Sequence, residues 1–434
     1  MPTKTFDAIV IGSGVIGSSI TYELGRRGLH TLTVDRNGGA GLGSTSFSSA
    51  IIRFTYSTYP GVAMSYEGLR YWENWAEHLK ADDVSHLATF SQCGMVTLKT
   101  SGGHHLKVLP HFDAIGIPYE DWNQQTFEAR LPELDLRRFG PPKRPDHEDF
   151  WDEPTDYLDG GIYTPEAGYV SDPQLAAHNL HMAASSLNCE FRFKTEIASI
   201  TQRDGQITGV ETLDGTVIEA PIVVNAAGPH SRIINEMAGA TNDMSIGTSP
   251  LRQEVHHVPS PEELNFGNRG FNLADDDNGI YVRPDIGNNV LVGSTEPECD
   301  PLHWVDADYE GQIQPEQWEA QVLRLNRRLP TIGVPHQKRG VVGVYDVADD
   351  WIPIYDKTCV NGFYVAIGTS GNQFKNAGIA GHRMAELITA VENGHNHDSD
   401  PVQVVGPYTG LNIDMGNFRR TRTINPNSSM SVHG

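Results

Sequence analysis

Short apolar runs alternate with a segment of helical periodicity at the start of the chain, and this pattern predicts a strand–helix–strand unit. Residues 8–12 (AIVIG) are typical of a buried strand. Residues 18–28 (SSITYELGRRG) place apolar side chains at helical spacing and end at a glycine, and residues 30–35 (HTLTVD) form a second strand ending in Asp35. The order of these elements indicates a fold of the α/β class.

Three glycines in the first turn, Gly12, Gly14 and Gly17, have the GxGxxG spacing of a dinucleotide-binding loop. Gly12 is expected to form the tight turn, Gly14 to let backbone approach a pyrophosphate, and Gly17 to let the helix pack on the strand. The helix N-terminus offers N–H groups and a positive dipole end to the phosphates. Asp35 then stands where an acidic side chain accepts from a ribose hydroxyl. A unit that used its glycines for packing alone would leave Asp35 unexplained.

A later apolar run, residues 222–229 (IVVNAAGP), ends in two alanines and a glycine. Side chains this small at the end of a strand allow backbone to approach a ligand closely. The preceding stretch, residues 189–221, alternates strand patterns with the turns RDGQ and LDGT, which predicts a β-meander inserted before the dinucleotide fold resumes. This split layout is common in two-domain flavoproteins, so we expect FAD rather than NAD.

Composition sets the size and the charge of the protein. The 434 residues, 38% of them hydrophobic, suggest two domains with a substantial core. The formal net charge of −23 argues against DNA, RNA or anionic lipid as a partner. A site for an anionic small molecule would therefore need cations of its own.

The cysteines and the ends of the chain bear on localisation. Cys93, Cys189, Cys299 and Cys359 are far apart, so neither a metal site nor a disulfide framework is expected. The chain enters its first strand at once, which leaves no room for a signal peptide, and no apolar run approaches membrane-spanning length. We expect a cytoplasmic protein without a membrane partner.

Five stretches resemble, in the same order, the D-amino-acid oxidase superfamily of FAD enzymes, and most of all its sarcosine oxidase, dimethylglycine dehydrogenase and glycine oxidase group. Within residues 7–390 they are DAIVIGSGVIGSSITYEL, GSTSFSSAIIRFTY, VVNAAGPHS, NGIYVRPDIGNNVLVGS and GVYDVADDWIPIYD…GFYVAIGTSGNQFKNAGIAGHRMAEL.

The resemblance implies a Rossmann-like FAD-binding domain and a substrate domain built on a mainly antiparallel sheet. The predicted boundaries are residues 1–90, 160–240 and 340–392 for the discontinuous FAD-binding domain, 91–159 and 241–339 for the substrate domain, and 393–434 for a C-terminal surface extension without a core of its own.

The resemblance also assigns roles to single residues. Arg53 and Lys375 match cations that bind a substrate carboxylate, Tyr345 matches a hydroxyl donor to it, and Tyr281 is expected to line the same site. Two converging cations would supply the local positive charge that the acidic chain otherwise lacks. From the residues alone, an ion pair between Arg53 and an acid such as Glu67 is an equal alternative.

The cofactor is expected to contact a larger set of residues from the same stretches. They are Gly12, Gly14, Val15, Ile16, Gly17, Asp35, Arg36, Gly43, Ser44, Thr45, Ile197, Ala227, Gly228, Gly368, Ser370, Gly371, Asn372 and Lys375.

The chain departs from the family at positions that bear on the flavin. Relatives that attach flavin covalently use a cysteine or a histidine where this chain has Gly343 and Phe47, so non-covalent FAD is expected. The family lysine that supports reaction with oxygen corresponds to Leu291 or Val292, which favours an electron carrier over O2 as the acceptor. Both acceptors stay open.

The expected reaction is oxidation of a secondary or tertiary amino acid, such as sarcosine or dimethylglycine, by hydride transfer to flavin, giving an imine that hydrolyses. Ala50 replaces a second family arginine, and Asn372 and Gln373 alter the pocket, so sarcosine need not be the substrate. The alternatives are a glycine or D-amino acid oxidase, a proline-type dehydrogenase, or an FAD-binding subunit of a larger complex. A monomer or small homo-oligomer is expected.

Overall fold

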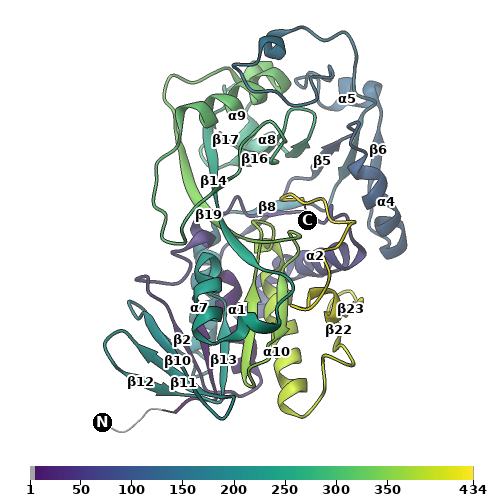
Figure 1. The fold of residues 1–434 in the computed structure, drawn as a ribbon. Helices are drawn as coiled ribbons and strands as arrows, with labels where there is room; N and C mark the ends of the chain where they lie inside the picture. The colour runs from purple at the N-terminus through teal and green to yellow at the C-terminus, as the bar shows by residue number, and fades with distance from the viewer. Residues whose placement is uncertain (1–4, 434) are drawn as a thin grey trace.

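A computed structural model describes residues 5–433, which form two stacked bodies. In Figure 1 the first strands of the chain lie in the lower body, and the C-terminal end of the trace lies between the two bodies. Among the described residues, no helix is both long enough and apolar enough to cross a bilayer.

The lower body is built on a six-stranded sheet in which β20 alone runs antiparallel to its neighbour. The strand order is β20 (Ile354–Lys357), β21 (Phe363–Ile367), β13 (Ile222–Asn225), β1 (Ala8–Ile11), β2 (Thr31–Val34) and β9 (Glu190–Arg192). The four residues of β1 are all buried, as expected for a central parallel strand.

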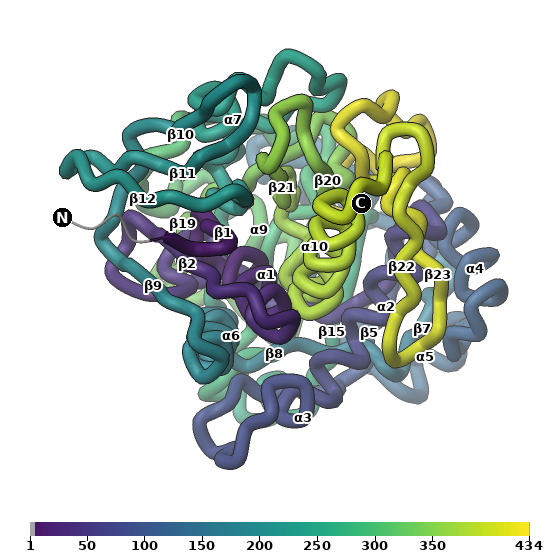
Figure 2. Tube along the Cα trace, turned by 90° about the horizontal axis from the view of Figure 1, so that it is seen from below, coloured from purple at the N-terminus to yellow at the C-terminus, as the bar shows by residue number. Residues whose placement is uncertain are grey.

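Helices cover one face of this sheet. Figure 2 shows α1 (Val15–Arg26) beside α10 (Ala377–Glu392), with α6 (Pro173–Ser185) on the other side of α1. Almost every residue of α1 is buried, because it packs between these two helices and the sheet. The helices α2 (Tyr59–Glu73) and α3 (Trp75–Leu79) extend the layer.

The other face carries the predicted meander, which the structure confirms as a three-stranded antiparallel sheet. Its strands are β10 (Ile197–Arg203), β11 (Gln206–Thr212) and β12 (Val217–Glu219), and the short helix α7 (Ser231–Met237) lies against β10. The chain passes from β12 directly into β13, so the meander is an insertion in the dinucleotide-binding fold.

The upper body is a nine-stranded sheet that is antiparallel except where β5 pairs with β15. Its strands are β18 (His303–Trp304), β14 (Thr248–Pro259), β17 (Asn289–Ser294), β16 (Ile280–Asp285), β15 (Asn272–Asp275), β5 (Met95–Leu98), β7 (Gly161–Thr164), β6 (Glu120–Trp122) and β19 (Gly340–Ala348), which pairs with β14. The predicted mainly antiparallel sheet is confirmed.

Short elements surround this sheet. They are the helices α4 (His104–Ile115), α5 (Gln124–Arg130), α8 (Phe266–Arg269) and α9 (Pro315–Arg328), and a small sheet of β3 (Ile51–Ile52), β8 (Gly168–Val170) and β4 (Phe90–Gln92). Arg328 in α9 is fully buried and bonds Asp275 at 2.8 Å and Asp277 at 2.9 Å, which ties α9 to the sheet.

Two strands belong to a different body from the domain to which the predicted boundaries assign them. β7 and β19 both fall in segments assigned to the FAD-binding domain, yet both hydrogen-bond within the nine-stranded sheet. The long strands β14 and β19 run from the upper body toward the lower one (Figure 1). Strand pairing is a long-range property, so motif spacing could not assign these residues.

The C-terminal segment joins the core of the lower body. The hairpin of β22 (Gln403–Val405) and β23 (Asn412–Asp414) lies against α2, and Val404, Ile413, Met415 and Phe418 are buried in the core around α10. The segment has no core of its own, but it is more than a surface extension.

Candidate functional site: a dinucleotide cavity beside a buried charged pocket

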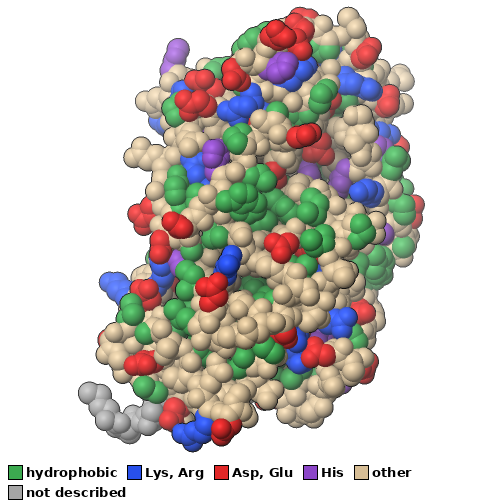
Figure 3. Space-filling view, in the orientation of Figure 1, with side chains coloured by type: hydrophobic (Ala, Val, Ile, Leu, Met, Phe, Trp, Pro, Cys, Tyr) green, Lys and Arg blue, Asp and Glu red, His purple; other side chains and the backbone are tan. Residues whose placement is uncertain are grey.

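A cavity of about 950 Å³ lies where the carboxyl ends of β1, β2 and β13 meet β19. Its volume is at the upper end of the range for small-molecule and cofactor sites, about 300–1,000 Å³. Figure 3 shows hydrophobic side chains gathered across the middle of this face, between the two bodies. Because the cavity lies at the carboxyl ends of these strands, it is at the place where open α/β sheets bind ligands.

Thirteen of the predicted cofactor residues line this cavity. They are Gly12, Gly14, Val15, Ile16, Gly17, Asp35, Arg36, Gly43, Ser44, Thr45, Ile197, Ala227 and Gly228. The other five, Gly368, Ser370, Gly371, Asn372 and Lys375, lie outside the lining that the described residues form. Thr369 and residues 340–344 of β19 line the cavity instead.

The glycines leave room at the phosphate end. Gly12 has φ +104°, and a Cβ there would lie 2.3 Å from the carbonyl oxygen of Ala226. A Cβ on Gly17 would lie 2.0 Å from the carbonyl oxygen of Gly12, so helix α1 approaches the strand only with glycine at this position. Gly14 is the N-cap and has no side chain to cover the helix end. This arrangement fits a pyrophosphate at the helix N-terminus.

Asp35 is held by three donors at the end of β2. The backbone N–H and the hydroxyl of Ser13 each donate to Oδ2 at 2.7 Å, and the N–H of Asn37 donates to Oδ1 at 2.8 Å. The carboxylate thus stays fixed against the cavity wall, with lone pairs left for a ribose hydroxyl. The residues present fit FAD.

A bridge between the two bodies closes one edge of the cavity. Arg36, after β2, lies 2.5 Å from Asp308 of the upper body, and His230 lies 2.8 Å from the same carboxylate. All three residues line the cavity. The sequence predicted Arg36 but gave no signal for His230 or Asp308, because a contact across two bodies leaves no local pattern.

Arg53 is buried beside this cavity and donates to backbone carbonyl groups. Its guanidinium bonds Thr55 at 3.0 Å and Val432 at 2.6 Å, with a longer contact of 3.3 Å to His433. Glu67, the alternative partner, accepts instead from the backbone N–H groups of residues 408 and 409 at 3.0 and 2.8 Å. Arg53 and Glu67 therefore each bind other groups, and the ion pair between them does not form.

Lys375 lies near Arg53, as the resemblance implied. The Nζ of Lys375 and the guanidinium carbon of Arg53 lie 5.5 and 4.9 Å from the centre of the Tyr56 ring. The ammonium donates to the carbonyl oxygen of Asn372 at 2.7 Å and to the Tyr56 hydroxyl at 3.3 Å. Burial and, secondly, the charge of Arg53 hold the pKa of Lys375 well below its usual value.

Tyr281 and Tyr345 complete the group of predicted substrate-binding residues. The Tyr281 hydroxyl lies 2.8 Å from the hydroxyl of Ser49. A Cβ on Gly371 would lie 2.3 Å from the ring of Tyr345, so the glycine gives that ring its place. Burial raises the pKa of both tyrosines, which keeps their hydroxyls protonated and able to donate.

Two acidic side chains that the sequence did not single out lie near Arg53. Burial raises the pKa of Glu296 to about 8, and its backbone has the left-handed φ of +53°. Asp276 is bonded to His433 at 2.8 Å. Although burial opposes it, the neighbouring imidazole rings of His433 and His104 hold the pKa of Asp276 well below its usual range. The pocket thus carries both signs of charge.

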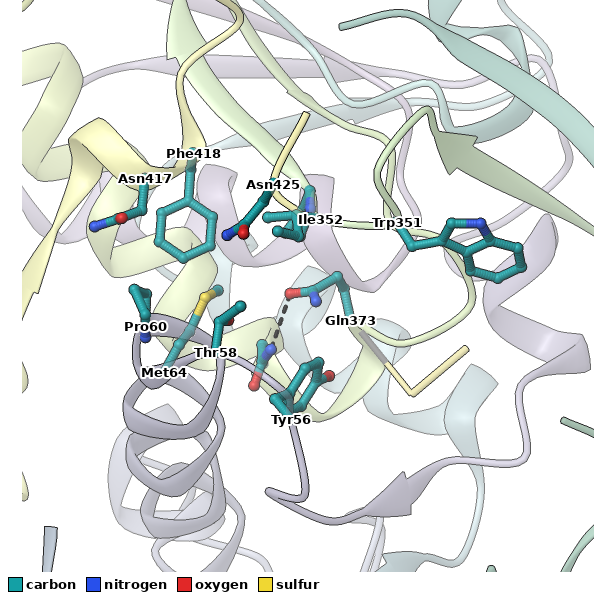
Figure 4. A pocket seen from close by; sticks show the side chains of 13 residues that line it. Tyr56, Thr58, Pro60, Met64, Trp351, Ile352, Gln373, Asn417, Phe418 and Asn425 are labelled. Carbon is teal, nitrogen blue, oxygen red and sulfur yellow. Dashed lines mark hydrogen bonds between the residues drawn. The ribbon is translucent and has the colours of Figure 1, made fainter. Parts of the chain in front are cut away.

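The C-terminal segment also walls the far side of this pocket. Figure 4 shows Asn417, Phe418 and Asn425 facing Tyr56 and Gln373 around a void of about 30 Å³. A void this small holds no substrate, so it marks only the place where the C-terminal segment packs against the site.

A Rossmann-like fold with a glycine-lined dinucleotide cavity and a second, mainly antiparallel body defines a two-domain flavoprotein. The model of the family described as "DAO: FAD dependent oxidoreductase" matches residues 7–387. The chain belongs to this family. It is an FAD-dependent oxidoreductase, as the resemblance predicted.

Known proteins extend this assignment. The chain is 22% identical over 411 residues to "Sarcosine oxidase subunit beta" of Rhodobacter capsulatus, with 89% of this chain and 86% of the relative covered. It is 25% identical over 300 residues to "Glycine oxidase" of Geobacillus kaustophilus, covering 68% and 71% of the two chains. The crystal structure of L-proline dehydrogenase from P. horikoshii superposes with a TM-score of 0.73 at 20% identity, covering 91% of this chain and 100% of that one, which confirms the fold.

Proposed function

We propose that the protein oxidises the amine of an amino acid, with FAD in the large cavity and the substrate carboxylate at Arg53. The observation that carries the proposal is the meeting of Arg53, Lys375, Tyr281 and Tyr345 in one buried pocket beside β19, whose residues 341–344 line the cofactor cavity. In a protein of formal charge −23, buried cations next to a flavin cavity favour an anionic substrate.

Each residue has a task that its chemistry suits. Arg53 grips a carboxylate with parallel N–H donors, and Lys375 adds a point charge. The protonated hydroxyls of Tyr281 and Tyr345 donate to the same carboxylate or orient the amine. Bound FAD supplies the acceptor of the hydride from the carbon next to nitrogen, and the resulting imine hydrolyses in water. The pocket excludes bulk water, which favours the neutral amine that this chemistry needs.

The favoured substrates are secondary or tertiary amino acids, with sarcosine and dimethylglycine as the first compounds to test. The relative named for sarcosine oxidation, matched along most of both chains, supports this choice. Glycine, D-amino acids and cyclic imino acids such as proline remain the alternatives, since relatives and neighbours carry those names at similar identity. Fold by itself does not choose among them.

The test is anaerobic reduction of the purified holoprotein by a panel of sarcosine, dimethylglycine, proline, glycine and D-alanine. The proposal expects rapid loss of the visible flavin band with at least one N-substituted compound. Air then reports the acceptor: slow reoxidation supports a carrier, in line with the apolar, buried Leu291 and Val292 in β17. Persistence of the flavin band with every amine would contradict the proposal.

A second candidate is an FAD-binding subunit of a larger complex. It is favoured by the printed name of the Rhodobacter capsulatus relative, which is that of a subunit. Size-exclusion chromatography combined with the flavin assay separates the two. If an amine reduces the flavin of a monomer or homo-oligomer, the protein does not require other subunits for this reaction.

A further inference from the structure

The C-terminal segment enters the pocket proposed for the substrate. Residues 425–428 are tied to the loop after β19, where the Ser428 hydroxyl donates to the carbonyl oxygen of Asp350 at 2.6 Å. Met430 then turns with φ +53°, and this residue is 49% exposed. Beyond this turn, Val432 and His433 are buried against Arg53.

Val432 is bound as an amino acid would be. Its backbone N–H donates to Oε2 of Glu296 at 3.0 Å, and its own carbonyl oxygen accepts from the Arg53 guanidinium at 2.6 Å. An acidic side chain, Glu296, therefore binds the nitrogen of Val432, and a basic side chain, Arg53, binds its carbonyl oxygen. The same two partners would suit the amino and carboxylate groups of a free amino acid.

The side chain of Val432 has a pocket of its own. It is buried in an apolar cluster with Leu251, Val347 and Trp351, and Tyr345 packs against this cluster. Three elements of the chain form it, namely β14, β19 and the loop that follows β19. A side chain about the size of valine therefore fills the space beside the tyrosine proposed to bind substrate.

The nitrogen of Val432 carries a substituent, because it is acylated by Ser431. The site thus accommodates a nitrogen with one hydrogen directed at Glu296 and one carbon group directed away from it. This is the substitution pattern of a secondary amine. On the other side, His433 bonds Asp276 at 2.8 Å, and its ring lies 5.1 Å from that of His104.

We propose that residues 431–433 are an internal pseudosubstrate, that Glu296 is the residue that binds the substrate amine, and that the Leu251–Val347–Trp351 cluster receives the substrate side chain. The inference rests on the proposed function and narrows it to N-substituted α-amino acids with an apolar side chain. The C-terminal segment must leave before such a substrate binds, so it competes with substrate and raises KM.

The experiment compares four forms of the holoprotein: the full chain, a chain shortened to end at Ser429, and the full-length variants Val432→Asp and Met430→Asp. Val432→Asp places a charge in the apolar cluster and beside Glu296, so it should expel the segment. Met430→Asp is the matched control, because its side chain is exposed two positions away.

The shortened chain and Val432→Asp should have a KM for N-methyl-L-valine lower by roughly tenfold than the full chain, with an unchanged kcat, because the segment in each loses its bond to the charged Arg53 and its bond to Glu296. Met430→Asp should match the full chain. An acetylated, amidated peptide of residues 429–433 should bind the shortened chain by calorimetry, compete with substrate, and bind the full chain far more weakly.

Glu296 is tested in the shortened chain by Glu296→Ala, which removes the oxygen that accepts from the Val432 N–H. The peptide and N-methyl-L-valine should both bind about tenfold more weakly, while the flavin spectrum stays that of the parent. N-methyl-L-valine should have a lower KM than sarcosine, because sarcosine leaves the apolar cluster unfilled.

The outcomes separate the two proposals. Equal KM values in all four chains, with no binding of the peptide, would overturn the pseudosubstrate while leaving amine oxidation intact. If the peptide bound and its binding depended on Glu296, but no amino acid reduced the flavin, the binding of residues 431–433 in this pocket would be supported. The proposed oxidation would then be contradicted. Weaker binding of N-methyl-L-valine than of sarcosine would overturn the assignment of the side-chain pocket.

Discussion

Arg53 and Lys375, from opposite ends of the chain, both lie over the ring of Tyr56, at 4.9 and 5.5 Å from its centre. Two cations beside the same ring repel each other, and the low pKa of Lys375 reflects first its burial and then this repulsion. The electron-rich face of the ring offsets part of that cost. A bound carboxylate would offset more, which is why the pair is expected to act together on substrate.

Replacing Lys375 by Met should weaken carboxylate binding while leaving FAD bound, since Lys375 lies outside the lining of the cofactor cavity formed by residues 5–433. Loss of one charge-assisted bond costs about 1.5–3 kcal/mol, or roughly ten- to a hundredfold in kcat/KM. Steady-state kinetics and the visible flavin spectrum check both parts. Lys107→Met, at an exposed position, is the control. An unchanged KM would remove Lys375 from the site.

Glu296 should make the protein less stable as pH rises. Burial raises its folded-state pKa from 4.5 to about 8, so between these values the folded chain holds a proton that the unfolded chain has released. Stability from this group is fully present below pH 4.5 and is lost as pH rises through about 8. The free energies of unfolding of the full chain and of Glu296→Gln, measured from pH 5 to 8, should differ by an amount that changes with pH. A constant difference would contradict the raised pKa of Glu296.

Asp35→Ala should lower the affinity for FAD by about tenfold, because the carboxylate that Ser13 and Asn37 hold in place at 2.7 and 2.8 Å would no longer accept from the ribose. The dissociation constant of FAD follows from the recovery of flavin fluorescence on release. Asp82→Asn, at an exposed position, should bind FAD like the parent. If both variants bound FAD equally well, the ribose contact would be disproved.

The bridge between Arg36 and Asp308 should slow the loss of FAD. Asp308→Asn removes a partner of both Arg36 and His230, and because the pair is partly exposed its worth is at most about 1 kcal/mol. FAD should dissociate up to about fivefold faster at low salt, with a smaller difference at high salt. Asp306→Asn in the same loop is the matched control, and equal rates for both would show that the bridge does not retain cofactor.

Gly371→Ala should displace Tyr345. The glycine has φ +67°, and an added Cβ would lie 2.3 Å from the tyrosine ring, so both backbone strain and a clash oppose the change. Stability should fall by about 1–3 kcal/mol, and kcat/KM should fall further than stability alone explains. Thermal unfolding and kinetics of Gly371→Ala beside Gly410→Ala, where the φ is +70° but the space is open, separate clash from strain.

The sequence by itself determined the dinucleotide-binding unit. Its strand, turn and helix are local in the sequence, so the spacing of the glycines at 12, 14 and 17 is sufficient to predict them. The structure adds that a Cβ on Gly12 or Gly17 would meet a backbone carbonyl oxygen. The meander and the small residues after β13 could be predicted for the same reason. Arg53 and Lys375 could be predicted through the family resemblance alone, because nothing in their local sequence sets them apart.

The tertiary structure alone decided which charges meet. Glu296, Asp276, Asp308 and His230 carry no local pattern, and their roles arise from contacts between distant strands and loops. The same is true of Val432, which reaches Arg53 across 379 positions. Such contacts form only when the two bodies have packed. A buried polar or charged group is then stable only if it has a partner, and that partner comes from anywhere in the fold.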